Sequence, residues 1–185
     1  ATHQLIRITQ YDYYTYTHSI NVGVFGVAFA RELMQDVDES YFYKLGLGFF
    51  LHDIGKSQLP IDVLNKPGPL SEDEWNLMKT HPEKGYKILQ DSGYMNKETS
   101  IIVLQHHERA DGSGYPNGLS GERIHTFAKI CAVADTFDAM TTNRCYQNPC
   151  SAYDSLNYIK NSMLKEYFDH EFFEKFVLLF SPNGS

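Results

Sequence analysis

The chain has 185 residues, of which 42% are hydrophobic, 14% aromatic and 21% charged. This composition is that of a globular domain with a single core, and it argues against disorder. The formal net charge of −7 argues against a duplex nucleic acid as partner, because such binding depends on clusters of Lys and Arg. The longest uncharged apolar stretch, Val22 to Ala30, is too short to span a bilayer, so no membrane segment is predicted.

The cysteines and the first residues of the chain indicate in which cellular compartment the protein is expected. Cys131, Cys145 and Cys150 have no CxxC spacing, so we interpret them as incidental thiols in a reducing compartment. We therefore expect a cytoplasmic protein. The first ten residues do not have the form of a signal peptide. They begin abruptly with helix-compatible sequence, which favours a piece cut from a longer chain.

Apolar residues recur mostly at helical spacing, and few segments alternate as a strand would. Helices are predicted, in chain order, over residues 12–34, 40–52, 71–78, 81–89, 97–107, 127–141, 152–164 and 171–180. Ser57 to Leu70 is predicted to be mostly loop and Asp111 to Gly121 to be a loop, because both are rich in glycine and proline. The predicted architecture is an all-α, multi-helix bundle.

Two helix starts carry the pattern of a capping box. Ser71 pairs with Glu74 in the first, and the same device recurs at Thr80. Pro82 suits a first helical position and is expected to keep His81 out of the α region, at the mouth of a helix. Trp75, in the short helix between them, is interpreted as a core residue.

The adjacent pair His52-Asp53 closes an apolar run, Leu45 to Leu51, that predicts a buried helix. A buried imidazole and a buried carboxylate need partners, because unpaired polar groups are costly in the interior. A divalent metal ion would satisfy both groups. An isolated pair of this kind is more often a helix end or a surface ion pair, so the rest of the chain must decide.

Other imidazoles and carboxylates lie at the ends or on the inner faces of the predicted helices. The candidate metal ligands are His18, His52, Asp53, His81, His106, His107 and Asp135. A helix bundle can bring such side chains to one interior point. Seven ligands exceed the needs of one tetrahedral zinc and favour two metals of higher coordination. Singly, each residue could instead be a satisfied core histidine or a buried cap.

Four segments together resemble a known family. HDIGK (52–56), HPEKG (81–85), HHERADGSGYP (106–116) and AVADTFDAMTTNR (132–144) resemble, in order and spacing, the signatures of the HD-GYP domain, a bacterial branch of the HD phosphohydrolases. The resemblance implies an all-α HD-domain bundle with a metal site in its core, and one HD-GYP catalytic domain over residues 1–185. Such domains usually follow a sensory or receiver domain, and the abrupt start fits a removed regulator.

The resemblance implies an activity as well. The expected reaction is metal-dependent hydrolysis of cyclic di-GMP to linear pGpG, and in many members on to GMP, through a hydroxide that bridges two metal ions. Iron or manganese is the favoured metal, with zinc or nickel as alternatives. Two other functions stay open: hydrolysis of another cyclic dinucleotide such as cyclic GMP-AMP, and a non-catalytic receptor for such a molecule. The complete ligand set favours catalysis.

Individual roles also follow from the resemblance. The seven candidate ligands match the metal ligands of the family, and Asp53 matches the carboxylate that bridges the two metals. Lys56 matches a lysine near the metals, expected to stabilise charge on the phosphate or to orient the hydroxide. Gly114, Tyr115 and Pro116 form the substrate-contacting triplet, and Arg144 matches a phosphate-contacting arginine.

Two positions depart from the family pattern. Tyr14 stands where some members carry a glutamate that helps to hold a third metal, so we expect two metals. Gln147 replaces a basic residue three positions after Arg144, which weakens one phosphate contact or leaves it to another residue.

Some polar and aromatic residues lie outside the candidate ligand set. Asp111 is expected either to hydrogen-bond a ligand histidine or to fix a turn. The tyrosines at positions 11, 13, 14 and 16 could stack bases, but packing in the core or against a second chain is favoured, which leaves a homodimer through the first helix open. No chemistry is assigned to His3, His125 or His170.

Overall fold

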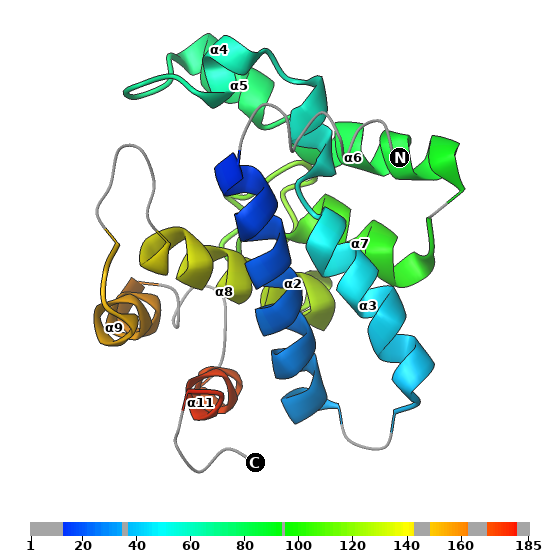
Figure 1. Cartoon of the computed structure of the whole chain (residues 1–185), viewed down its shortest axis with the longest axis vertical. Coiled ribbons are helices and arrows are strands. Elements are labelled where there is room, and N and C mark those ends of the chain that lie inside the picture. The colour runs from blue at the N-terminus through cyan, green and yellow to red at the C-terminus, as the bar shows by residue number, and fades with distance from the viewer. Residues whose placement is uncertain (1–12, 35–36, 94, 143–148, 163–169, 181–185) are drawn as a thin grey trace.

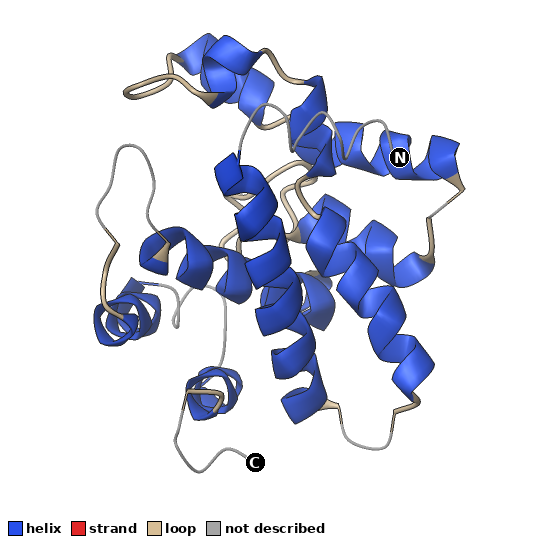
Figure 2. Ribbon diagram, viewed as in Figure 1, coloured by secondary structure: helices blue, strands red, loops and turns tan. Residues whose placement is uncertain are grey.

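The structure, a computed structural model, describes residues 13–34, 37–93, 95–142, 149–162 and 170–180. The α-helices are, in chain order, α2 (Tyr13–Leu33), α3 (Glu39–Leu51), α4 (Ile61–Leu64), α5 (Glu72–Met78), α6 (His81–Ser92), α7 (Lys97–Gln105), α8 (Thr126–Thr141), α9 (Ala152–Ser162) and α11 (His170–Leu178), with the 3-10 turns η1 (Ile54–Gln58) and η2 (Gly121–Arg123). The described residues contain no strand beyond one isolated bridge, Asp111 to Ser120, and Figure 2 shows helices joined by loops. The all-α prediction is confirmed.

Helix α2 is the central element of the bundle (Figure 1). Both α3 and α8 pack against it, and α7 packs against α3 and α8. Helices α9 and α11 cover α8 and α2 on one side, while α4 and α5 project at the end where α2 begins. None of the helices that the structure describes has both the length and the apolar character needed to cross a bilayer.

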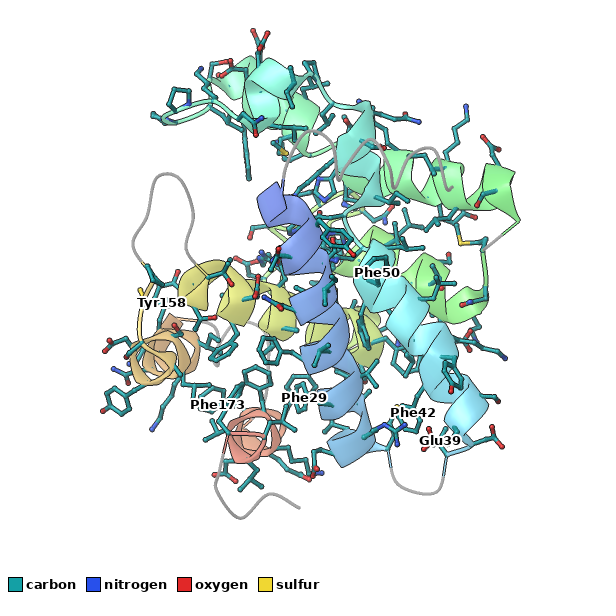
Figure 3. All side chains as sticks on the ribbon, viewed as in Figure 1. Phe29, Glu39, Phe42, Phe50, Tyr158 and Phe173 are labelled. Atoms are coloured by element: carbon teal, nitrogen blue, oxygen red, sulfur yellow. The ribbon has the colours of Figure 1, made fainter. Side chains whose placement is uncertain are left out.

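Two groups of buried apolar side chains hold the helices together. The larger group joins α2, α3, α8 and α11 through aromatic rings such as Phe29, Phe49 and Phe176, which are fully buried. The Phe29 ring of α2 contacts the Phe172 and Phe176 rings of α11, with centroids 4.7 and 5.1 Å apart, in the region where Figure 3 labels Phe29 and Phe173. A smaller group, built around Leu89 and Val103, joins the end of α3 to η1, α6 and α7. Burying each such side chain stabilises the fold by roughly 1.5–3 kcal/mol. The smaller group fixes the three helix ends that carry the polar site.

Helix ends confirm one predicted cap and correct another. The Ser71 side chain accepts a hydrogen bond from the Glu74 main-chain N–H, and the Glu74 carboxylate accepts one from the Ser71 N–H, so this capping box is confirmed. The predicted box at Thr80 is wrong. Thr80 has α-helical dihedrals, and its hydroxyl donates to the Leu77 carbonyl at 2.6 Å. Helices α5 and α6 follow each other within a single turn, which leaves no room for an extended cap.

The same tight connection corrects the prediction for His81. His81 is the first residue of α6 and not an extended residue before it, with Pro82 as its neighbour inside the first turn. Its position at the mouth of a helix is nevertheless as expected.

Residues 57–70 are mostly loop, as predicted, apart from short helical pieces that the prediction did not include. The segment begins within η1 and contains the short helix α4, so it is not loop throughout. Trp75 was predicted to lie in the core, and this is wrong, because its side chain is 47% exposed. Helix α5 has no buried residue, since it lies at the outer edge of the bundle.

Candidate metal centre

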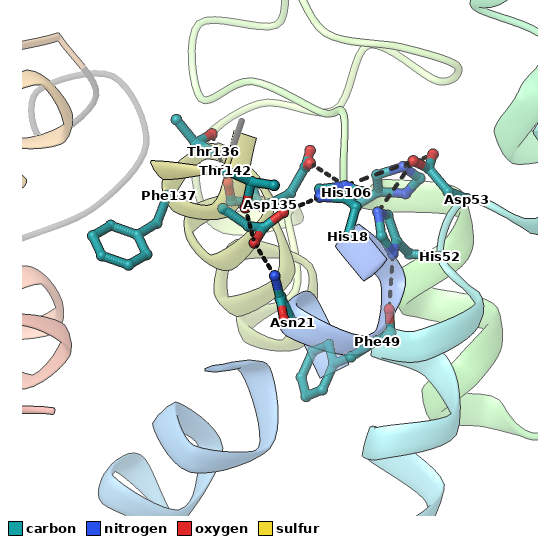
Figure 4. A network of polar contacts seen from close by, with 12 residues as sticks. His18, Asn21, Phe49, His52, Asp53, His106, Asp135, Thr136, Phe137 and Thr142 are labelled. Carbon is teal, nitrogen blue, oxygen red and sulfur yellow. Dashed lines mark hydrogen bonds and ion pairs between the residues drawn. The ribbon is translucent and has the colours of Figure 1, made fainter. Parts of the chain in front are cut away.

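The predicted ligands meet where the ends of three helices reach the sides of two others. His52 directly follows α3, His81 begins α6 and His106 directly follows α7. His18 comes from α2 and Asp135 from α8. Residues separated by more than a hundred positions thus line one interior site (Figure 4).

Asp53 lies at the centre of this site and is 2% exposed. Its Oδ2 lies 3.4 Å from His52 Nε2 and 3.9 Å from His18 Nε2. Its Oδ1 lies 3.1 Å from His81 Nε2 and 3.8 Å from His106 Nε2. Each carboxylate oxygen therefore faces a different set of imidazoles.

The ligand atoms accordingly form two groups, each with all members within 4.8 Å of one another. One group is His18, His52 and Asp53; the other is Asp53, His81, His106 and His107. Asp53 is shared by both groups. The seventh candidate, Asp135, belongs to neither group but reaches the site through His18, because its Oδ1 lies 3.0 Å from His18 Nε2.

Main-chain carbonyls fix the orientation of three of these imidazoles. In each, Nδ1 donates to a carbonyl one turn earlier: His52 to Phe49 at 2.8 Å, His81 to Met78 at 2.9 Å and His106 to Val103 at 3.0 Å. A carbonyl only accepts, so in the neutral ring Nδ1 carries the proton and Nε2 presents a lone pair. The Nε2 atoms of His81 and His106 lie 3.2 Å apart. Two facing lone pairs at that distance call for a cation or a proton.

Buried polar atoms without a hydrogen-bond partner indicate whether a metal ion would fit this site. Among the described residues, two buried side-chain atoms have no hydrogen-bond partner, His52 Nε2 and Asp53 Oδ1. Each unsatisfied buried group costs about 1–3 kcal/mol. Both atoms are potential ligands, one in each group, and a divalent cation would satisfy them. Imidazole nitrogens together with carboxylate oxygens suit Fe, Mn, Zn or Ni.

His18 is held between two carboxylates. Its Nδ1 lies 2.6 Å from Asp138 Oδ2, on the side opposite Asp135 (Figure 4). Burial lowers the pKa of His18, but the bonds to both carboxylates outweigh burial and raise it to about 9. Both carboxylates thus favour a protonated His18 ring, and a metal at Nε2 would take the place of one proton.

Asp138 is a site residue that sequence reasoning missed. Its side chain is 1% exposed, and its Oδ1 accepts hydrogen bonds from Asn21 Nδ2 at 2.7 Å and Thr142 Oγ1 at 2.8 Å (Figure 4). Although burial raises the pKa of Asp138, the hydrogen bond from His18 lowers it below its usual value. Asp138 fixes the His18 tautomer that leaves Nε2 for a metal, an arrangement typical of metal sites. Its spacing of three from Asp135, on one face of α8, was the available signal.

The charges of the central residues suit metal binding. Burial alone would raise the pKa of Asp53, but Lys56 and His52 hold it well below its usual range. Burial lowers the pKa of His106 to about 4, and burial together with neighbouring His106 lowers that of His107 well below its usual range. An ionised carboxylate and neutral imidazoles are the protonation states that ligation requires.

The predicted substrate residues lie beside the second ligand group. The Tyr115 ring stacks on the His107 ring with centroids 4.8 Å apart, and the Tyr115 N–H donates to the His107 carbonyl at 3.2 Å. Gly114 permits this approach, because a Cβ there would lie 2.5 Å from Glu108 Cα. Pro116 follows Tyr115 through a cis peptide bond. Arg144 and Gln147 lie outside the described residues, as does the side chain of Tyr14.

Glu108 is a second residue that sequence reasoning missed. Its side chain is buried, and its two carboxylate oxygens accept hydrogen bonds from the Asn117 N–H at 2.7 Å and the Leu119 N–H at 2.8 Å. The carboxylate therefore ties the loop that carries Tyr115 to the end of α7. The signal was a charged residue placed directly after two candidate ligands, His106 and His107.

Other predicted residues fall outside the site. Asp111 Oδ1 accepts from the Ser113 N–H at 2.9 Å, which confirms the turn interpretation over a contact with a ligand histidine. His125 caps α8, and its Nδ1 accepts from the Phe127 N–H at 3.2 Å. Cys131 and Cys150 are free thiols. Cys145, His3 and the side chain of His170 lie outside the described residues.

The sequence is similar to a known family over most of its length. The HD domain family matches residues 27–172. The chain is 37% identical over 173 residues to "Cyclic di-GMP phosphodiesterase PA4108" of Pseudomonas aeruginosa, covering 94% of this chain and 41% of that protein. It is 34% identical over 168 residues to "3'3'-cGAMP-specific phosphodiesterase 1" of Vibrio cholerae, covering 89% of this chain and 37% of that protein. The chain thus spans less than half the length of these relatives.

A solved structure shares the fold. The HDG"Y"P protein Bd1817 of Bdellovibrio bacteriovorus superposes with a TM-score of 0.70 at 21% identity, covering 90% of this chain and 53% of that one. The family match spans most of the bundle, and the HHERADGSGYP string follows α7 within the described site. The chain belongs to the HD domain family, and within it to the HD-GYP branch.

Proposed function

We propose that the chain is a metal-dependent phosphodiesterase that hydrolyses cyclic di-GMP to linear pGpG, with GMP as the product of any second hydrolysis. The observation that carries the proposal is the pair of buried ligand groups that share Asp53. The name of the Pseudomonas relative, a cyclic di-GMP phosphodiesterase, supports the choice of substrate.

The proposed cofactors are two divalent metal ions, with iron or manganese favoured and zinc or nickel as alternatives. His18, His52 and Asp53 would hold one ion, with Asp135 beside them, and the other would lie among Asp53 and three histidines, namely His81, His106 and His107. When bound, such a pair supplies positive charge to the phosphodiester and a nucleophile from water at neutral pH.

Lys56 is the proposed catalytic cation of the chain itself. Its Nζ lies 2.5 Å from Asp53 Oδ2, and its side chain is 26% exposed. Lys56 therefore contacts the shared carboxylate and is also accessible from solvent. From there it can stabilise charge on the phosphate. Lys56→Ala should reduce turnover far more than metal content, and equal activity would reject the role.

Substrate contacts are proposed for the loop that Glu108 holds. Tyr115 presents its ring beside His107, with Gly114 and Pro116 shaping the main chain on either side. The pKa of the Tyr115 hydroxyl is raised by burial and by Asp53, so it stays a neutral donor at physiological pH. Arg144 is proposed as a phosphate contact by resemblance alone.

Product analysis tests the proposal. Metal-loaded protein is incubated with cyclic di-GMP, cyclic GMP-AMP and cyclic di-AMP, and the products are resolved by chromatography. We expect pGpG from cyclic di-GMP at the highest rate, and GMP in addition if the linear product is hydrolysed further. A higher rate with cyclic GMP-AMP would favour the second candidate, which the Vibrio relative supports by its name. No turnover of any of them, with two metals bound, would favour a receptor.

The proposal extends to the domain and its assembly. Residues 1–185 are proposed as one HD-GYP catalytic domain, joined in a longer protein to a sensory or receiver domain and acting in the bacterial cytoplasm. A homodimer through α2 is proposed because Ile20 and Val24, one turn apart, are 38% and 61% exposed. Val24→Asp should then shift a dimer to a monomer in analytical ultracentrifugation, and an unchanged mass would reject this interface.

A further inference from the structure

Trp75 is the only tryptophan among the 185 residues, and its side chain is 47% exposed. Tryptophan is highly buried on average, so an exposed indole on a short surface helix requires a reason. Its ring lies 6.2 Å from the Tyr115 ring, at an interplanar angle of 82°. Trp75 therefore contacts the loop that borders the metal centre.

A path of aromatic rings leads from Trp75 to the ligands. Tyr115 stacks on His107 at 4.8 Å and lies 6.2 Å from the His81 ring. Both histidines belong to the second ligand group. The indole is thus two ring contacts from a ligand, on helix α5 at the end of the molecule where α2 begins (Figure 1).

The main chain that carries the indole is held in place although helix α5 is short. The Trp75 main-chain N–H donates to the Ser71 carbonyl at 2.8 Å, in the turn that also carries the capping box of Ser71 and Glu74. Lys66 Nζ donates to the Glu74 carboxylate at 2.5 Å and ties the preceding loop to the same cap. A half-exposed ring on a fixed main chain, in contact with Tyr115, loses less conformational entropy on binding a flat partner than a ring on a mobile loop.

We propose that Trp75 is a stacking platform for one purine base of the cyclic dinucleotide, a substrate-binding residue beyond the GYP triplet. This inference rests on the proposed function. With the phosphate at the metal centre, a base that extends outward past Tyr115 would reach the side on which the indole lies. Stacking of a base on an aromatic side chain changes affinity by roughly five- to a hundredfold.

The first test uses the single tryptophan as its own probe. Emission from metal-loaded wild-type protein is followed in a stopped-flow instrument after mixing with cyclic di-GMP. We expect quenching within the first turnover, saturating over the same substrate range as the reaction rate. Turnover with unchanged emission would overturn the proposal.

The second test separates base binding from chemistry. Trp75→Leu, Trp75→Phe and wild-type protein are compared on cyclic di-GMP and on methyl p-nitrophenyl phosphate, a phosphodiester without a base. We expect Trp75→Leu to raise KM for cyclic di-GMP about tenfold and Trp75→Phe to recover most of the loss, because both Phe and Trp stack. Metal content and the rate on the small ester should stay at their wild-type values.

The outcomes remain distinguishable. Tyr43→Leu is the matched control, because Tyr43 is 79% exposed on α3 and should leave KM unchanged when replaced. An unchanged KM in Trp75→Leu, or an equal loss on both substrates together with a lower melting temperature, would overturn the stacking role. Hydrolysis of the small ester by wild-type protein with no turnover of any cyclic dinucleotide would instead refute the proposed function, and the platform with it.

Discussion

Replacing Glu108 by alanine should release the loop that carries Tyr115. The carboxylate of Glu108 is the acceptor for two main-chain N–H groups, those of Asn117 and Leu119, at 2.7 and 2.8 Å. The side chain is only 2% exposed, so water does not readily replace it. Alanine removes both acceptors and leaves two donors without a partner.

The size of the effect follows from these two bonds. A hydrogen bond to a charged group contributes about 1.5–3 kcal/mol, so the pair holds the loop closed by at least about 3 kcal/mol. Because 1.4 kcal/mol corresponds to about a factor of ten, protection of the two amides against hydrogen exchange should fall by more than about a hundredfold. The stacking of Tyr115 on His107 should weaken with it, and KM for the substrate should rise.

Amide hydrogen exchange read by NMR measures this directly. Glu108→Ala should expose the amides of Asn117 and Leu119, while core amides such as that of Val103 keep their protection. Glu122→Ala, which removes an exposed glutamate from the same stretch, should change nothing. Unchanged protection of Asn117 and Leu119 in Glu108→Ala would show that other contacts hold the loop, and would refute the reasoning.

Two further predictions concern the positions that assemble the ligands. Gly55→Ala should lower the free energy of unfolding in urea by at least about 3 kcal/mol, because its Cβ would lie 1.9 Å from the His81 carbonyl oxygen. Gly23→Ala is the control and should be neutral or stabilising, because the added Cβ would meet only ordinary van der Waals contacts. A mild effect of Gly55→Ala would mean that the two segments do not approach so closely. Asp138→Asn should weaken metal binding about 10- to 100-fold in calorimetry, because His18 loses the carboxylate that orients it, and wild-type affinity would remove that role from Asp138.

Most of the residues that the structure brings together at the candidate site were predictable, because they occur in short strings with fixed spacing. His52-Asp53 and His106-His107 stand at the ends of apolar helical segments, and a helix end is a place from which a side chain can reach a shared interior point. The helices themselves followed from apolar spacing. Their bounds agree with the prediction to within one to three residues where both ends are described.

The residues that were missed act through partners far away in the sequence. Asp138 is separated from His18 by 120 positions, and no local sequence pattern predicts a contact over that separation. Glu108 binds main-chain groups in a loop, whose path is not encoded by side-chain periodicity. Trp75 was placed in the core because it is large and apolar, but α5 lies at the edge of the bundle, where tertiary position overrides the residue type.

The shared carboxylate is the centre of the account, and metal content tests it most directly. Purified protein is stripped with a chelator, reconstituted with Mn²⁺ or Fe²⁺ and analysed for metal per chain. Two ions are predicted for the wild type, about one for His18→Ala, and close to none for Asp53→Ala, because both ligand groups share Asp53. A single ion in the wild type, or two ions retained by Asp53→Ala, would contradict the account.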